Sequence, residues 1–237
     1  LHLGERECSV QRRHQKLIEE SPSPALDDAL RARFTAAAVR LGAAVGYVGA
    51  GTCEFLLGPD GGFYFLEVNA RLQVEHPVTE LRTGLDLVRE QLRVAAGLPL
   101  SFRQEDVRFT GHAIEARITA EDPFNHFMPA SGRIAALGMP MGPGVRLDTA
   151  IYDGMSIPLF YDSLLAKLIC WGQDRAEAIA RLRRALDEFT IAGVRTTIPF
   201  AQWITRHPRF LRGDVSTDFV AEEWDLSPQP SPRRGER

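Results

Sequence analysis

The sequence contains no apolar run close to the ~20 residues that a membrane-spanning helix needs. It has only three cysteines, Cys8, Cys53 and Cys170, with no Cys-x-x-Cys pairing, and no secretory signal is visible. These absences favour a reduced, cytoplasmic setting and no membrane partner. The formal net charge is only −3, so no electrostatic attraction to nucleic acid is expected.

Two kinds of site motif are also missing. The glycines between residues 42 and 51 lack the Gly-x-x-x-x-Gly-Lys-[Ser/Thr] spacing of a phosphate-binding loop, so they are expected to permit turns and close packing. No His-x-x-x-His pair or Cys/His cluster supports a zinc site. The 237 residues are 44% hydrophobic and 25% charged, which is typical of a soluble protein with one large domain or two modest ones.

The most informative stretch is residues 63–77, which is predicted to be extended. Alternate side chains of a strand point to opposite faces. One parity holds Glu67, Asn69, Arg71, Gln73 and Glu75, and the other holds Tyr64, Leu66, Val68, Ala70, Leu72 and Val74. A half-buried strand with an ordinary solvated face is one interpretation, although such faces usually include Lys, Ser or Thr.

The preceding segment, residues 51–57, is predicted to be a second strand that forms a hairpin with this stretch. Asp60-Gly61 is a strong turn signal, and a turn centred there places Glu54 opposite Glu67, with Cβ atoms ~4.5–5.5 Å apart. Two opposed carboxylates repel each other unless a cation lies between them, and Mg²⁺ takes one or two carboxylates plus substrate phosphates. Asn69 would add a neutral oxygen. A one-residue slip of the turn would move Glu54 to the other face.

The polar positions cannot all serve one small site, because a fully extended run of this length spans ~26 Å. We therefore expect Glu67 and Asn69 to serve a metal, and residues 71–75 to bend away and hold a second, anionic substrate. The guanidinium of Arg71 is suited to a carboxylate-like anion. Glu75 beside it is a candidate general base.

Five collinear motifs resemble those of the biotin carboxylases, which have the ATP-grasp fold. They are CSVQRRHQK at 8–16, GYVGAGTCEF at 46–55, EVNARLQVEHPVTE at 67–80, GHAIEARI at 111–118 and YDSLLAKLI at 161–169. The resemblance runs from Leu1 to about Trp224 and implies an α+β fold. Residues 1–100 would complete the second lobe of an ATP-grasp domain, and residues 101–224 would form a C-terminal domain with an antiparallel sheet and helices. The start at Leu implies the C-terminal half of a longer protein.

The resemblance also implies a role for each site residue. Metal ions (Mg²⁺ or Mn²⁺) would be held by Glu54, Glu67 and Asn69. Bicarbonate would be bound by Arg71, Gln73 and the Val74 backbone N–H, and ATP by Gln11, His14, Leu56, Glu54 and Glu67. Lys16 would contact bicarbonate or phosphate, and Arg117 would stabilise the biotin enolate. On the residues alone, Arg12, Arg13 and Lys16 could form a solvated edge, and Glu115 and Arg117 a surface ion pair worth little.

The implied reaction is ATP-dependent carboxylation of biotin on a carrier. Glu75 would take the proton of bicarbonate, whose oxygen attacks the γ-phosphate to give carboxyphosphate. This decomposes to CO₂ and phosphate, and the phosphate can deprotonate biotin. The implied partners are a biotin carboxyl carrier protein or domain, a carboxyltransferase and a second copy in a homodimer. Acetyl-CoA carboxylase in fatty acid biosynthesis is the expected setting, although propionyl-CoA, methylcrotonyl-CoA and pyruvate carboxylases share this half.

Two other functions remain open. A carbamoyl-phosphate-type ATP-grasp ligase shares the carboxylate and Asn pattern, but it does not explain residues 73–77 or 111–118. A non-catalytic module that dimerises or docks a carrier is the second. Because the nucleotide lobe would lie upstream of Leu1, this polypeptide alone is not expected to turn over ATP.

The remaining elements follow from periodicity and caps. Helices are predicted at residues 27–41 with Asp27 or Asp28 as cap, at 83–97 with Gly97 as stop, at 175–189 and at 196–207. One strand is predicted at residues 10–18 and another at 111–119, and short strands between 120 and 172 predict an antiparallel sheet. Residues 225–237 are rich in Pro and Ser and are predicted to be disordered.

Overall fold

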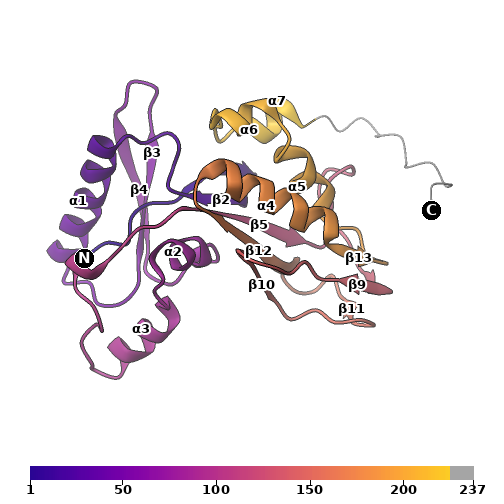
Figure 1. Cartoon of the computed structure of the whole chain (residues 1–237), viewed down its shortest axis with the longest axis horizontal. Coiled ribbons are helices and arrows are strands. Elements are labelled where there is room, and N and C mark those ends of the chain that lie inside the picture. The colour runs from indigo at the N-terminus through magenta and orange to yellow at the C-terminus, as the bar shows by residue number, and fades with distance from the viewer. Residues whose placement is uncertain (225–237) are drawn as a thin grey trace. The chain divides into compact units, whose positions relative to one another are not determined.

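The computed structural model describes residues 1–224 and has a mixed α/β architecture (Figure 1). The predicted disorder of residues 225–237 lies outside this range. The helices are α1 (Asp28–Ala44), α2 (His76–Thr83), α3 (Leu87–Ala95), α4 (Arg175–Glu188), α5 (Ile198–Ile204), α6 (Pro208–Arg212) and α7 (Phe219–Glu223), with a 3₁₀ turn at Gln104–Asp106. Among the described residues, no helix is both long and apolar enough to cross a bilayer.

The strands are mostly short outside one sheet. They are β1 (Glu7–Arg12), β2 (Gln15–Ser21), β3 (Thr52–Leu57), β4 (Phe63–Asn69), β5 (His112–Thr119), β6 (Glu121–Asp122), β7 (Met128–Pro129), β8 (Gly132–Arg133), β9 (Ala136–Gly138), β10 (Val145–Thr149), β11 (Ser156–Ile157), β12 (Leu164–Gly172) and β13 (Thr190–Ala192). The chain divides into two compact units: unit 1 comprises residues 1–7, 19–114 and 171–178, and unit 2 comprises residues 8–18, 115–170 and the chain from 179.

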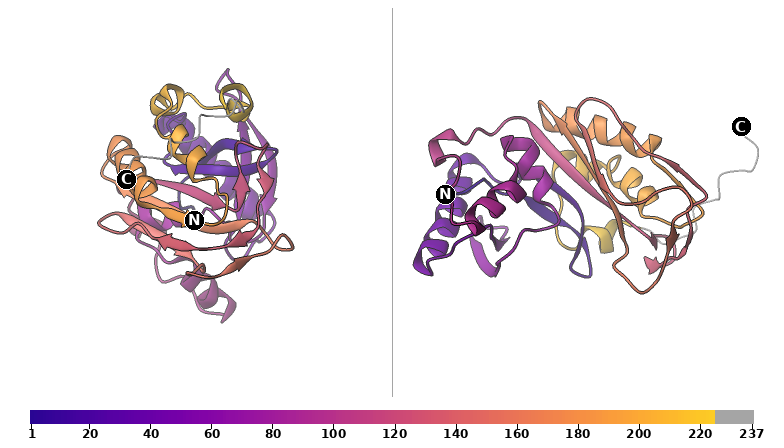
Figure 2. Two further views of the ribbon diagram at one scale, coloured as in Figure 1. Left: turned by 90° about the vertical axis from the view of Figure 1, so that its right-hand side faces the viewer. Right: turned by 90° about the horizontal axis from the view of Figure 1, so that it is seen from below.

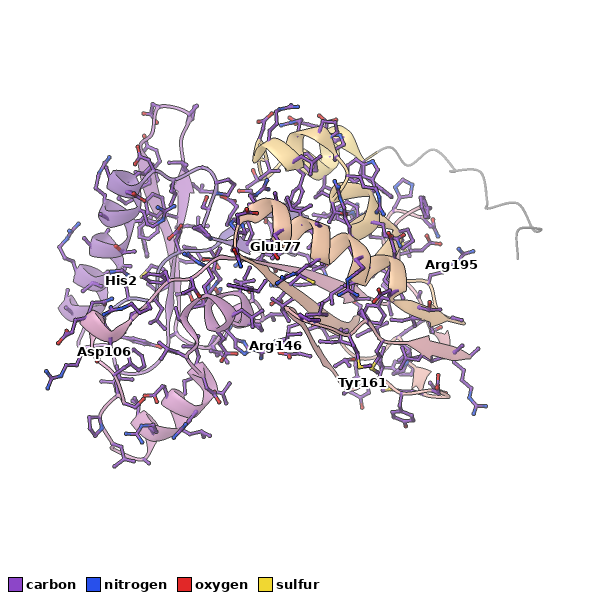
Figure 3. The ribbon with its side chains drawn as sticks, viewed as in Figure 1. His2, Asp106, Arg146, Tyr161, Glu177 and Arg195 are labelled. Atoms are coloured by element: carbon purple, nitrogen blue, oxygen red, sulfur yellow. The ribbon has the colours of Figure 1, made fainter. Side chains whose placement is uncertain are left out.

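The largest sheet has five strands in the order β1-β2-β5-β12-β10. Strands β10 and β12 are antiparallel, with Val145 opposite Cys170, so the predicted antiparallel pairing in this region is confirmed. On the edge strand β10, Arg146, labelled in Figure 3, forms an ion pair with Asp148 at 2.8 Å. The central strand β5 pairs with β2 and β12, and it is buried along almost its whole length.

In unit 1, helix α1 packs against the β3–β4 hairpin, as Figure 1 shows. The ring of Phe34 lies 5.2 Å from that of Phe55 and 4.2 Å from that of Phe63, measured between centroids. The helix begins as predicted, because the Asp27 side chain accepts a hydrogen bond from the backbone N–H of Leu30 at 2.7 Å. The ring contacts of Phe34 identify the face of the hairpin that carries Phe55 and Phe63 as the apolar face.

A β-bulge in β4 changes the predicted alternation. Glu54 lies opposite Glu67, as predicted, but Phe55 lies opposite Phe65, so Leu66 is an extra residue with no partner in the ladder. Opposed residues share a face. Consequently Tyr64 lies on the face of Glu54 and Glu67, and Phe65 lies on the apolar face. The predicted assignment of Tyr64 to the apolar face was wrong for this reason.

The helix predicted at residues 83–97 is α3, which is shorter, and the preceding helix α2 was not predicted. Helix α2 ends at Gly84, which has a left-handed φ of 70°, and α3 begins after Asp86, whose side chain accepts from the Arg89 N–H at 2.8 Å. The predicted stop at Gly97 is confirmed, with a φ of 77°. The apolar stripe of α3 lies at the surface, and Leu92 is 68% exposed.

Unit 2 contains most of the buried apolar side chains of residues 1–224. Helix α4 lies along the five-stranded sheet (Figure 2) and buries Ile179, Leu182 and Leu186, whereas Ala176 is exposed. A second cluster beneath the short strands consists of Ala120, Ile134, Ile151, Ile157, Leu165 and Val194. The helix predicted at residues 196–207 is α5, which is shorter at both ends.

Candidate functional site

The β3–β4 hairpin brings two carboxylates together on one face. Glu54 on β3 and Glu67 on β4 are directly opposed, and Glu67 is exposed. The Asn69 side-chain nitrogen donates to both, to Glu67 Oε1 at 2.8 Å and to Glu54 Oε1 at 3.2 Å. An amide donor between two like charges reduces their repulsion, and this position is also where a bridging cation would lie.

The chain leaves the extended conformation after Asn69, as predicted, but the following residues do not bend away from the predicted metal ligands. Strand β4 ends at Asn69, the chain bends at Arg71, and a turn over residues 74–75 leads into α2. Arg71 is exposed, and its guanidinium donates to Leu72 O at 3.1 Å and to Asn69 Oδ1 at 3.4 Å. The extended alternation predicted through residue 75 therefore stops at Asn69, and residues 70–75 form a separate loop.

This loop turns back toward the carboxylates. Gln73 is 6% exposed, and its Nε2 donates to Glu54 Oε1 at 2.8 Å. Glu75, the residue that caps α2, is 1% exposed. The predicted base is therefore a buried carboxylate, next to an amide that contacts one of the predicted metal ligands.

A residue that sequence reasoning did not select lies at the centre of this region. Arg6 donates to Gln73 Oε1 at 2.7 Å and to Thr52 Oγ1 and Thr79 Oγ1 at 3.1 Å each. One of its terminal nitrogens lies 3.9 Å from Glu75 Oε1. The hydrogen-bond partners are 46 to 73 residues away along the chain, so no local motif could have indicated them.

Four other predicted site residues belong to unit 2, namely Gln11, His14, Lys16 and Arg117. The strands β1, β2 and β5 of this region continue into unit 1. The strand predicted at residues 10–18 is instead the β1–β2 hairpin, with Gln11 on β1 and Lys16 on β2. Its two-residue turn consists of Arg13 and His14, with φ of 49° and 66°. Left-handed φ at both central residues is the geometry of the type I′ turn that two-residue β-hairpin loops favour, although it is less common for residues other than glycine, asparagine and aspartate.

The fourth of these residues, Arg117, lies on β5 and is half-buried, and its backbone carbonyl accepts a hydrogen bond from Thr197 Oγ1 at 3.1 Å. Glu115 on the same strand is 0% exposed. The interpretation of Glu115 and Arg117 as a solvated surface pair is therefore wrong, because the Glu115 side chain is fully buried.

The remaining predicted residues on the hairpin and its loop are Leu56 and Val74. Leu56 shares the face of Glu54 and is 49% exposed, opposite Tyr64. Val74 lies in the turn before α2. Cys53 lies on the opposite face of β3, and burial raises the pKa of its thiol, which argues for a packing role and against a nucleophilic one.

The donor set fits a hard cation that shares its ligands with a substrate. Within residues 1–224, no group of three or more His, Cys, Asp or Glu side chains is arranged to hold a metal. Glu54, Glu67 and Asn69 instead supply two carboxylates and one amide. Mg²⁺ is commonly bound by one or two carboxylates, waters and phosphate oxygens, so this set is suited to a metal–nucleotide complex.

Comparison with known families covers nearly the whole chain. Residues 1–103 match the carbamoyl-phosphate synthase L chain, ATP binding domain, and residues 115–222 match the biotin carboxylase C-terminal domain. A biotin carboxylase from Nostoc sp. is 57% identical over 94% of this chain and 50% of the relative. The chain belongs to the biotin carboxylase family. Its fold is accordingly that of ATP-grasp enzymes, which are ATP-dependent ligases.

Other members of this family are equally informative. A pyruvate carboxylase subunit from Methanothermobacter thermautotrophicus is 55% identical over 94% of this chain and 45% of the relative. The biotin carboxylase domain dimer of Hydrogenobacter thermophilus 2-oxoglutarate carboxylase, in complex with MgADP, ADP and bicarbonate, has a TM-score of 0.92 at 45% identity, covering 94% of this chain and 49% of that one. The chain thus spans about half the length of these biotin carboxylase relatives.

Proposed function

We propose that this chain supplies the metal- and bicarbonate-binding part of a biotin carboxylase, which uses ATP and bicarbonate to carboxylate biotin held on a carrier. One observation carries the proposal. A continuous set of hydrogen bonds links Glu67, Asn69, Glu54, Gln73 and Arg6, and it ends beside the buried carboxylate of Glu75. The proposed metal ligands, anion-binding loop and general base are thereby joined in one connected array.

The metal ligands proposed are Glu54, Glu67 and Asn69, and bound Mg²⁺ or Mn²⁺ would neutralise charge on the ATP phosphates. Rotation of the Asn69 amide about its last side-chain bond would turn Oδ1 toward the carboxylates in place of Nδ2. Leu56, on the same face, would pack against the nucleotide. The resemblance to biotin carboxylases also assigns ATP contacts to Gln11 and His14. These assignments are supported by the shared face of the hairpin and by the family membership.

Bicarbonate would be held by Arg71, Gln73 and the Val74 backbone N–H. The exposed guanidinium of Arg71 can offer a bidentate fork to this anion. Glu75 then takes the bicarbonate proton, and the bicarbonate oxygen attacks the γ-phosphate to give carboxyphosphate and ADP. Lys16 and Arg117 would contact phosphate and the biotin enolate.

The proposal is tested by bicarbonate-dependent ADP release in the complete carboxylase that contains this chain, with free biotin as acceptor. Glu75→Gln should lower kcat by about 100-fold or more, since a positioned general base contributes ~10²–10⁴. Glu54→Gln should weaken Mg²⁺-nucleotide binding. The matched control is Glu105→Gln, which removes a 70% exposed carboxylate of unit 1. Unchanged nucleotide binding in Glu54→Gln would contradict the metal assignment.

The same assay separates the two rival functions. A carbamoyl-phosphate-type ligase would accept ammonia in place of biotin, and its ADP release would be stimulated by ammonia alone. A non-catalytic module would bind a carrier or dimerise, but Glu75→Gln would leave every measured property unchanged. The motifs at residues 73–77 and 111–118, which a carbamoyl-phosphate-type ligase does not explain, favour the biotin carboxylase.

We further propose that acetyl-CoA is the final acceptor, that a biotin carrier and a carboxyltransferase are the partners, and that the protein is a cytoplasmic homodimer. The relatives include propionyl-CoA, methylcrotonoyl-CoA and pyruvate carboxylases. The alternative acceptors to test are therefore propionyl-CoA, methylcrotonyl-CoA and pyruvate. Incubating the carboxylated carrier with each acyl-CoA and with pyruvate, in the presence of the cognate carboxyltransferase, would decide it. Preference for pyruvate would exclude acetyl-CoA carboxylase.

A further inference from the structure

Arg6 joins the anion-binding loop, strand β3 and helix α2 through the hydrogen bonds of a single guanidinium. Its Nη1 donates to Thr79 on α2, and its Nη2 donates to Thr52 on β3 and to Gln73 in the loop. Its side chain is 14% exposed. The Arg6 side chain is therefore largely buried, and its guanidinium holds the loop against the hairpin.

The first consequence concerns the orientation of the Gln73 amide. Arginine offers donors only, and an ionised carboxylate offers acceptors only. Arg6 therefore requires Gln73 Oε1 on its own side, and Glu54 requires Gln73 Nε2 on the other side, where Nε2 and Glu54 Oε1 are 2.8 Å apart. With both neighbours present, the amide has one favourable orientation, and Nε2 stays on the side of the carboxylates.

The second consequence concerns Glu75, which is buried beside the same guanidinium. A carboxylate with 1% exposure needs a compensating cation or hydrogen bonds to stay ionised. Arg6 Nη2 lies 3.9 Å from Glu75 Oε1, while Arg71, the other arginine of this region, is exposed and hydrogen-bonded to Leu72 and Asn69. The two arginines thus have different tasks: Arg71 faces outward for the substrate, and Arg6 supports the loop.

We propose that Arg6 is a positioning residue for the bicarbonate-binding loop, acting through Gln73 and Glu75 without touching the substrate. The inference rests on the proposed function, because it takes Gln73 as a bicarbonate ligand. A lysine would keep the charge, but it would lose the planar fork that reaches three acceptors from two nitrogens. Arg6→Lys therefore removes the positioning and retains the cation.

The main test is steady-state kinetics of the complete carboxylase. Arg6→Lys should raise KM for bicarbonate about tenfold or more, the loss expected for a hydrogen bond to a charged donor, and should change KM for ATP much less. In the Gln73→Ala background, Arg6→Lys should have little further effect on KM for bicarbonate, because coupled residues are not additive. Additive effects in the double variant would overturn the proposal.

Arg31→Lys is the matched control for a general loss of stability. Arg31 is also a half-buried arginine of unit 1, and its guanidinium donates to Glu5, Asp28 and Leu26 O at 2.7–2.9 Å, away from the loop. It should lower Tm comparably without the change in KM for bicarbonate. If both variants change KM for bicarbonate by the same factor, Arg6 has a structural role only, and the proposal is wrong.

A readout without turnover keeps this inference separate from the proposed function. In the ¹⁵N-labelled chain, the Gln73 side-chain NH₂ resonances, assigned by Gln73→Ala, should shift and broaden in Arg6→Lys but not in Arg31→Lys. If the wild-type carboxylase shows no bicarbonate-dependent ADP release, the proposed function fails, and the NMR comparison still tests positioning. Unaltered Gln73 resonances in Arg6→Lys would refute the role of Arg6.

Discussion

At the scale of single residues, the opposed carboxylates of Glu54 and Glu67 impose a cost on the hairpin. Like charges directly opposite each other across two strands are destabilising. The Asn69 amide nitrogen, which donates to both carboxylates, offsets part of this repulsion. An arrangement that costs stability in the protein alone and fits a cation is characteristic of a site retained for binding.

Glu67→Gln should therefore stabilise the chain in metal-free buffer by roughly 0.2–1 kcal/mol, because the repulsion is removed and Gln Oε1 can still accept from Asn69. Denaturant unfolding in the presence of EDTA measures this difference, and Glu105→Gln is the control for removing an exposed charge. A loss of stability in Glu67→Gln would show that the pair is held by other interactions and is not a source of repulsion.

Cys170 is buried whereas Cys8 and Cys53 are half-buried, and this difference predicts how readily each thiol reacts. Cys170 is fully buried on β12, and burial raises the pKa of its thiol to about 12, so at pH 8 only about one molecule in ten thousand carries the thiolate. Cys170 should not react with a thiol reagent until the chain unfolds, whereas half-buried Cys8 should react in the folded state. Cys170→Ser should abolish the unfolding-dependent reaction, and rapid labelling of Cys170 in native buffer would contradict its burial.

At the scale of elements, a buried ionic cluster joins two strands and a helix within unit 1. Glu20 on β2 is 2% exposed and accepts from His112 Nε2 on β5 at 2.6 Å and from Arg175 on α4 at 2.7 and 2.9 Å. Burial raises the pKa of Glu20, but the hydrogen bonds from His112 and Arg175 outweigh it and leave this pKa below its ordinary value. The cluster therefore stabilises the fold only while Glu20 is ionised.

Arg175→Met should destabilise the chain by about 1.5–3 kcal/mol near pH 7, the range for a hydrogen bond to a charged group. Because the folded-state pKa of Glu20 is depressed, its contribution is complete above the unfolded pKa of about 4.3 and is lost as the pH falls through the folded pKa. The wild-type chain should thus lose more stability than the variant between pH 5 and lower pH. Arg184→Met, at an exposed pair with Glu188 on the same helix, should change stability little.

In the β3–β4 hairpin, a β-bulge compensates for a one-residue shift of the turn. The turn pairs Leu57 with Phe63, which would place Glu54 opposite Leu66 in a regular ladder, but the bulge restores the pairing of Glu54 with Glu67. The predicted pairing was confirmed although the turn is one residue out of the predicted register. Turn chemistry specified a hairpin, whereas packing of Phe55 and Phe63 against Phe34 is consistent with the register adopted.

At the scale of the whole molecule, unit 1 exposes apolar side chains that an isolated domain would normally bury. Phe65 and Leu66 on the hairpin are each 55% exposed, and Leu92 on α3 is 68% exposed. The chain also spans about half the length of its biotin carboxylase relatives. Both facts support the expectation that catalysis by the family requires more protein than the residues described here.

This polypeptide alone should therefore show no bicarbonate-dependent ATP hydrolysis, whereas the complete carboxylase should. A coupled assay for ADP, run with and without bicarbonate at equal molar concentrations of the two proteins, measures the difference. Circular dichroism of the isolated chain supplies the control that it is folded. Turnover by this chain alone would mean that the nucleotide is held entirely by residues described here as one half of a site.

The sequence by itself determined the features that depend on neighbours along the chain. Asp27 caps α1, Gly97 ends α3, and the Asp60-Gly61 turn brings two strands together, because these outcomes follow from local backbone geometry and side-chain hydrogen bonds. The motif around residues 67–80 also identified the family. Each of these required no knowledge of residues distant in the sequence.

The tertiary structure alone decided which side chains meet across long separations. Arg6 contacts partners 46 to 73 residues away, and the Glu115 side chain is fully buried. The Arg13-His14 turn adopts left-handed φ although it contains neither glycine nor asparagine. Burial and long-range hydrogen bonds depend on how elements pack, and packing energy is a property of the folded molecule rather than of any segment of its sequence.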